Sequence, residues 1–167
     1  PYLVTGYTTS KRRIGSVRNN ASGDFNDFRM VQPGPPSLIM YRADQAAAGN
    51  LNIVSGGTAT TNTATSVDVG APPTASAVIL TAQLYDSRPN PMTEEQSLRI
   101  RASTDTNAVN FHASPTCDTQ TSADGYSGSA LQAVGLDGTR QIINWNLGNP
   151  ETNTPVFISV LGYYEGL

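Results

Sequence analysis

The sequence predicts an all-β fold, a β-sandwich or jelly roll of short antiparallel strands. Runs of alternating apolar and polar residues recur along the chain, and clusters of Gly, Pro, Asn, Asp and Ser separate them. Charged residues make up only 14% of the composition. The longest helix-forming stretch, Asp44 to Ala48, runs into Gly49 and Asn50 and is too short to be stable alone. These observations favour strands over an α/β arrangement.

A chain of 167 residues can bury one core and predicts one domain. We expect residues 1–32 to form an N-terminal strand or hairpin segment that leads into a β-sandwich over residues 33–167, in one compact unit. Arg13 to Val17 and Phe25 to Val31 predict a strand pair across a polar turn. The run Pro33 to Pro36 should end this segment, because its prolines lack backbone donors.

Later runs predict the strands of the sandwich. In Leu98 to Ser103 apolar positions alternate with arginine and serine, which predicts one buried and one solvated face. Ala77 to Leu80 is continuously apolar and predicts a central strand covered on both faces. The expected strands are Leu38 to Arg42, Leu51 to Ser55, Thr65 to Val69, Ala75 to Tyr85, Ser97 to Ala102, Ala108 to His112 and Val156 to Tyr164.

A local turn signal lies near the end of the chain. Asp137 and Gly138 separate Leu131 to Leu136 from Thr139 to Trp145, and Asp-Gly supplies the positive φ angles of a type I′ turn. These residues therefore predict a β-hairpin. The uncharged, Thr-rich segment 56–66 predicts a flexible loop or a weak edge strand.

Charge and cysteine content argue against several classes of protein. The net charge of −3 argues against a general nucleic-acid binder, and we interpret the basic cluster from Lys11 to Arg18 as a solvated or partner-facing surface. Cys117 is the only cysteine, which excludes an intrachain disulfide and a thiolate zinc site. No apolar run approaches the ~20 residues of a membrane span, so we expect no membrane insertion. No motif indicates a cofactor.

The chain offers little for catalysis, and we predict that it is not an enzyme. His112 is the only imidazole for a catalytic triad, and a Cys117–His112 pair is less simple than a polar connection at Cys117. Residues 118–125 lack the alternating oxygen ligands of a calcium loop, so no metal is expected. A carboxylate pair for glycoside hydrolysis would come from Asp86, Glu94, Glu95, Asp105, Asp118 and Asp124.

Two longer loops are the places where a rigid scaffold would tolerate binding residues: Asp86 to Gln96 and Ser114 to Ser129. Tyr126 is the best candidate for stacking on a ligand, whereas Trp145 lies in a strand and is expected in the core. We expect these loops to contribute more to binding than any strand residue. The candidate ligand-binding residues are Tyr126, Asp124, Glu94 and Glu95.

One stretch carries a resemblance to a known family. Gly6 to Gly23 reads Gly-Tyr, a spacer, Arg-Arg-Ile-Gly, a small residue, an apolar residue, Arg, and a polar turn that ends at Gly. In order and spacing this resembles a stretch of bacteriophage tail-fibre and related tail proteins. An apolar run at Ala75 to Leu84 and a terminal strand with Leu161-Gly162-Tyr163 are also similar to that family, whereas Phe28 to Pro33 departs from its usual Phe-Thr-Gln run.

The resemblance implies a virion structural role, a homotrimeric fibre and exposure outside the cell, with no catalytic residues to carry over. We therefore expect a tail-fibre domain that assembles with itself and with other virion proteins, located in the tail rather than the capsid, and that recognises a bacterial surface glycan. Two alternatives stay open. One is a capsid decoration or tail-assembly protein without a ligand, and the other is a polysaccharide depolymerase.

Overall fold

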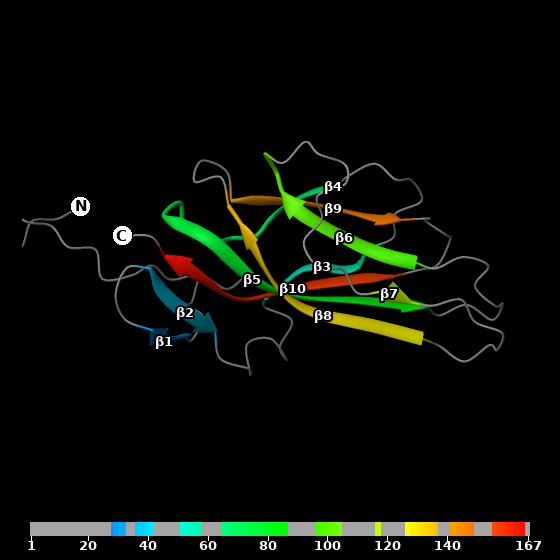
Figure 1. The fold of residues 1–167 in the computed structure, drawn as a ribbon, viewed down its shortest axis with the longest axis horizontal. Helices are drawn as coiled ribbons and strands as arrows, with labels where there is room; N and C mark the ends of the chain where they lie inside the picture. Colours follow the sequence, from blue (N-terminus) through cyan, green and yellow to red (C-terminus); the bar gives the residue numbers. More distant parts are fainter. Residues whose placement is uncertain are drawn as a thin grey trace, which may run out of the picture.

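The computed structural model describes residues 28–32, 36–41, 51–57, 65–86, 96–104, 116–117, 126–136, 141–148 and 155–165. Every regular element within these ranges is a β-strand, which confirms the predicted all-β fold. Figure 1 shows the strands in two layers. They are β1 (Phe28–Gln32), β2 (Ser37–Tyr41), β3 (Asn52–Gly57), β4 (Thr65–Asp68), β5 (Ala75–Asp86), β6 (Gln96–Ala102), β7 (Thr116–Cys117), β8 (Tyr126–Gly135), β9 (Ile142–Gly148) and β10 (Val156–Glu165).

The strands form two antiparallel sheets. The larger sheet has the order β1-β2-β10-β5-β8, with β3 also paired to β10, and the smaller sheet has the order β4-β9-β6-β7. Buried side chains from both sheets form one hydrophobic cluster, with Leu80 and Ile158 from the larger sheet and Ile100 and Leu147 from the smaller. The molecule is therefore a β-sandwich whose core lies between the two sheets.

The order of pairing makes this sandwich a jelly roll. The strand pairs are nested in the sequence. β6–β7 is the innermost pair, and β5–β8, β4–β9 and β2–β10 follow outward, as in one long antiparallel ribbon. The β5–β10 and β6–β9 pairs then join successive turns of the rolled ribbon. Eight strands arranged in this way in two sheets are a jelly roll. β1 and β3 are additions to it.

The predicted hairpin of Leu131 to Leu136 with Thr139 to Trp145 is wrong in its pairing, although both strands exist. β8 pairs with β5 in the larger sheet, whereas β9 pairs with β4 and β6 in the smaller one. Val134 of β8 and Ile143 of β9 are both fully buried. The two strands thus bury their apolar faces from opposite sheets, and that burial outweighs a local turn preference. Asp137 and Gly138 lie outside the described residues.

β1 is an edge strand that extends the larger sheet beyond the jelly roll. It pairs with β2 on the other side of the proline-rich run, with Phe28 opposite Tyr41 and Met30 opposite Ile39. The predicted partner of Phe25 to Val31, Arg13 to Val17, lies outside the described residues. The proline-rich run begins directly after the last residue of β1, as predicted.

β5 is the central long strand of the larger sheet, between β10 and β8. Val78 and Leu80 are fully buried, whereas Ile79 and Thr81 are half-buried. The prediction that Ala77 to Leu80 is covered on both faces is therefore wrong for one face. A sandwich covers each sheet on its inner side only, so the other side of β5 is an outer surface.

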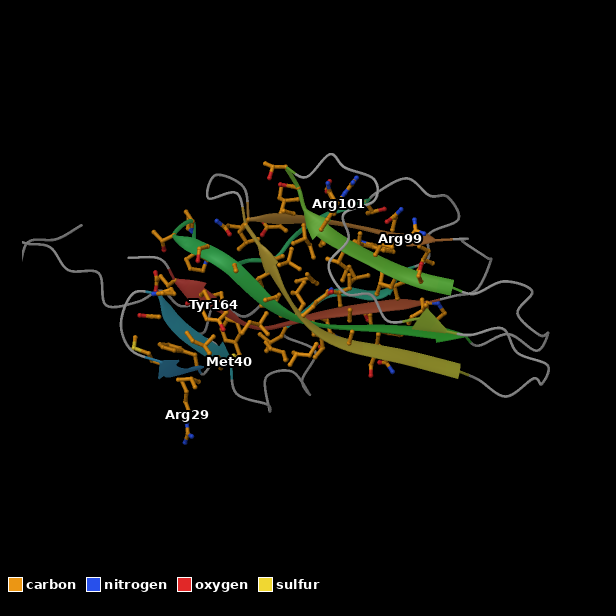
Figure 2. All side chains as sticks on the ribbon, in the orientation of Figure 1. Arg29, Met40, Arg99, Arg101 and Tyr164 are labelled. Atoms are coloured by element: carbon orange, nitrogen blue, oxygen red, sulfur yellow. The ribbon has the colours of Figure 1, made fainter. Side chains whose placement is uncertain are left out.

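The expected alternation in β6 is confirmed at its apolar positions. Leu98 and Ile100 are fully buried, and Arg99 and Arg101 between them are half-buried. Figure 2 shows both arginines on the outer side of the smaller sheet. Trp145 in the neighbouring strand β9 is only 5% exposed, which confirms its place in the core.

β10 contains a bulge that changes which side chains face the core. Its register against β5 shifts between Val160 and Gly162. Before the shift Ile158 and Val160 are buried, and after it Tyr163 and Glu165 are buried. A bulge adds one residue and so reverses the alternation of faces. As a result Tyr163 turns inward, with its ring centroid 6.1 Å from that of Tyr41.

Among the described residues, no helix is long and apolar enough to cross a membrane.

Candidate functional site

The sequence-predicted ligand residues are placed only in part. Tyr126 is the first residue of β8 and pairs with Asp86, the last residue of β5. The structure describes the backbone of these two residues and not their side chains. Asp124, Glu94 and Glu95 lie outside the described residues.

The strand ends that flank both predicted loops lie at one end of the sandwich. Asp86 pairs with Tyr126 in the larger sheet, and Gln96 pairs with Cys117 in the smaller sheet. Figure 1 shows these ends of β5, β6, β7 and β8 together on the right. Residues 87–95 and 118–125 are therefore attached to the scaffold at the same end, which the sequence did not reveal. The prediction of one loop from Ser114 to Ser129 that contains Tyr126 is wrong, because this range includes β7 and the first residues of β8.

A hollow of about 360 Å³ lies on the outer face of the larger sheet, over β5, β8 and β10. It was not among the sites predicted from the sequence. Its volume falls in the lower part of the range for small-molecule sites, about 300–1,000 Å³. The lining residues are Thr81, Ala82, Gln83, Ser129, Ala130, Leu131, Phe157 and Ser159.

Strand register places the outward-facing members of this lining in two rows. Phe157, Gln83 and Ser129 lie opposite one another on β10, β5 and β8. Ser159, Thr81 and Leu131 form the next row on the same strands. Directly opposite side chains in such a sheet have Cβ atoms about 4.5–5.5 Å apart, so each row reaches across the hollow.

The rows combine long and short side chains. Phe157, Gln83 and Leu131 are long, whereas Ser129, Ser159 and Thr81 are short, and this difference in length leaves space on the face of the sheet. Leu131 is 66% exposed, the largest value for a large hydrophobic side chain among the described residues. The hollow thus offers an aromatic ring and an aliphatic side chain next to hydroxyl and amide groups.

β3 continues the rows beyond the hollow. Ser55 lies opposite Phe157, and Asn52 lies opposite Ser159. The Ser159 hydroxyl donates a hydrogen bond of 2.5 Å to the Asn52 side-chain oxygen. This contact holds the hydroxyl of Ser159 at the border of the hollow, and it leaves lone pairs of the same oxygen to accept a further hydrogen bond.

The hollow is electrically neutral. None of the residues that line it has an ionisable side chain. Two of the described arginines, Arg99 and Arg101, lie on the outer side of the other sheet, and a third, Arg29, extends from the edge strand β1 (Figure 2). The outer face of the smaller sheet thus carries Arg99 and Arg101, and the outer face of the larger sheet carries Arg29 at its β1 edge and the neutral hollow over β5, β8 and β10.

The two carboxylates whose side chains are described, Asp68 and Glu165, accept hydrogen bonds from other groups of the fold. Asp68 accepts a hydrogen bond of 2.6 Å from the backbone N–H of Gly70, and Glu165 accepts one of 2.8 Å from the Thr74 hydroxyl. Within the described part of the chain, no three His, Cys, Asp or Glu residues are grouped to hold a metal ion. His112 lies outside the described residues, and Cys117 is in β7 without a described side chain.

The geometry defines a class of protein: a jelly-roll β-sandwich with an uncharged hollow, lined by apolar and polar side chains, on the outer face of its larger sheet. The chain matches no protein-family model, and no curated protein is similar to it in sequence.

One local signal could have revealed the hollow. Thr81 and Gln83 alternate with Leu80, Ala82 and Leu84, so the polar side of β5 is visible in the sequence. The residues that complete the hollow lie far along the chain, at Ser129 to Leu131 and at Phe157 to Ser159. Only the pairing of β5 with both β8 and β10 brings them together.

Proposed function

We propose that this chain is a structural module of a bacteriophage virion, a tail-fibre domain that assembles with itself and attaches the particle to a bacterial surface. The resemblance from Gly6 to Gly23 supports the tail-fibre assignment. The observation that carries the attachment role is the neutral hollow on the outer face of the larger sheet, because a fibre module needs a surface that can bind another molecule.

The described side chains fit a role in binding better than a role in catalysis. Asp68 and Glu165 accept hydrogen bonds within the fold, and no residue that lines the hollow is a carboxylate. A glycoside hydrolase needs two carboxyl groups on either side of the scissile bond. The proposal is therefore a binding module, and the depolymerase stays the alternative, since the side chains of the carboxylates that the sequence offers for hydrolysis are not described: Asp86, Glu94, Glu95, Asp105, Asp118 and Asp124.

The edge strand β1 supports self-assembly. Phe28, Met30 and Val31 are 38%, 42% and 59% exposed, although these residues are large and apolar. An edge strand also has backbone groups available for pairing. We place this strand at the contact between the copies of a homotrimer. Light scattering that gives the 17.6 kDa mass of a single chain would contradict this arrangement.

Electron microscopy of virions tests the assignment to the tail. Virions are labelled with a gold-tagged antibody raised against this chain, and the expected result is label on tail fibres. Virions treated with pre-immune antibody are the control. Label confined to the head would replace the proposal with a capsid decoration protein, and virions that carry no label would remove the virion role.

A further inference from the structure

The outer-face hollow has the chemistry of a site for uncharged sugars. The hydroxyls of Thr81 and Ser129 can both donate and accept hydrogen bonds, as sugar hydroxyls do, and the Ser159 hydroxyl, which donates to Asn52, can accept one. We propose that this hollow binds a neutral carbohydrate, with the ring of Phe157 against the C–H face of a sugar and Gln83 bonded to its hydroxyls. This inference deepens the proposed attachment function and rests on it for its biological role.

The position of Phe157 supports stacking. Its neighbours along β10, Val156 and Ile158, are fully buried, while Phe157 is half-buried and lines the hollow. The ring therefore faces outward and offers apolar surface to a ligand. Apolar contact with a ring, combined with a few well-placed polar groups, is the usual composition of a small-molecule site.

The neutrality of the lining excludes an anionic sugar as the preferred ligand. A carboxylate or sulfate placed in the hollow would lose hydration, and no cationic side chain among the lining residues would replace it. A neutral hydroxyl exchanges its hydrogen bonds with water for bonds with the hydroxyls and the amide. The expected order of affinity is therefore glucose-like or N-acetylated sugars above uronic acids.

A peptide strand fits this position less well. Peptides that add to a sheet pair with the backbone of an edge strand. β5 and β10 pair on both sides, and β8 pairs with β5 on the side that borders the hollow, so the backbone groups of these strands at the hollow are used within the sheet. A ligand here must be recognised by side chains, and the volume of about 360 Å³ suits a short oligosaccharide.

This site differs from the one predicted at the loops. The Gln83–Ser129 pair lies three residue pairs along the same ladder from Asp86–Tyr126. At about 3.4 Å per residue the two positions are roughly 10 Å apart. Substitutions can therefore separate a ligand bound in the hollow from one bound at Tyr126.

Two substitutions in the hollow have a matched control. Phe157→Ala removes the ring, and Gln83→Glu keeps the shape of the exposed side chain while it removes the amide donor and adds a charge. Ala133→Glu adds the same charge at another exposed position on the outer face of β8, outside the hollow. Thermal unfolding of each variant shows that the domain is folded.

Saturation-transfer NMR on the complete chain tests the inference. The probes are glucose, galactose, mannose and N-acetylglucosamine, with glucuronate as the charged comparator. The expected result is transfer to at least one neutral sugar with an affinity of about millimolar to micromolar, stronger than for glucuronate. Phe157→Ala and Gln83→Glu should each weaken it at least tenfold, whereas Ala133→Glu should leave it within about twofold.

Three outcomes would overturn the inference. They are no transfer to any of the neutral sugars, a preference for glucuronate, and a signal that Tyr126→Ala abolishes while Phe157→Ala and Gln83→Glu retain it. None of these bears on where the chain lies in a virion, so a failure here is distinguishable from a failure of the tail assignment.

Discussion

Gly162 shows how single residues fix the shape of this molecule. A Cβ atom built at this position would clash with the carbonyl oxygen of Ile39 and lie 2.8 Å from the Met40 sulfur. β10 can therefore pair closely with β2 only because residue 162 has no side chain. The Leu161-Gly162-Tyr163 motif of the sequence thus has a structural explanation: a bulge, a close approach and a buried ring.

At the residue scale, Gly162→Ala should destabilise the fold by about 1–3 kcal/mol, because a methyl group is forced into a filled space. Gly135→Ala is the control, since nothing lies within 4 Å of a Cβ there. Its effect should stay within about 0.5 kcal/mol. Urea unfolding of both variants measures the difference. Equal stability of the two variants would show that the close approach at Gly162 does not constrain the fold.

At the scale of elements, the sequence predicted strands better than their partners. The ranges of β5, β6 and β10 agree with expectation within a few residues, because alternation and turn residues are local signals. The predicted pairing of β8 with β9 was wrong. These strands follow one another in the sequence, but the jelly roll places β8 in the larger sheet and β9 in the smaller one. The hollow was missed for a related reason, since its rows join strands distant in sequence.

The bulge in β10 gives an element-scale prediction. Deletion of Leu161 removes the extra residue of the bulge and leaves Gly162 opposite Ile79 and Tyr163 opposite Val78, so Tyr163 should stay in the core, at a cost of about 0.5–3 kcal/mol. Leu161→Ala keeps the bulge and should cost a similar amount, because Leu161 is only half-buried. Chemical denaturation measures both. A deletion variant that is far less stable than Leu161→Ala would mean that the fold needs the bulge itself.

At the scale of the whole molecule, the jelly roll separates three tasks. The inner faces form one hydrophobic core, the edge strand β1 presents exposed apolar side chains, and the outer face of β5, β8 and β10 presents the neutral hollow. Attachment through many copies compensates for weak single sites, because linked sites bind with avidity. A fibre of the kind proposed would thus bind a surface firmly although each hollow is small.

The most direct test of this account is binding of the fluorescently labelled, assembled domain to cells of the host bacterium. The account predicts that Phe157→Ala and Gln83→Glu reduce binding at least about tenfold, which corresponds to about 1.4 kcal/mol, and that Ala133→Glu leaves it unchanged. Binding that survives both hollow substitutions at full strength would contradict the claim that the outer face of the larger sheet attaches the virion to its host.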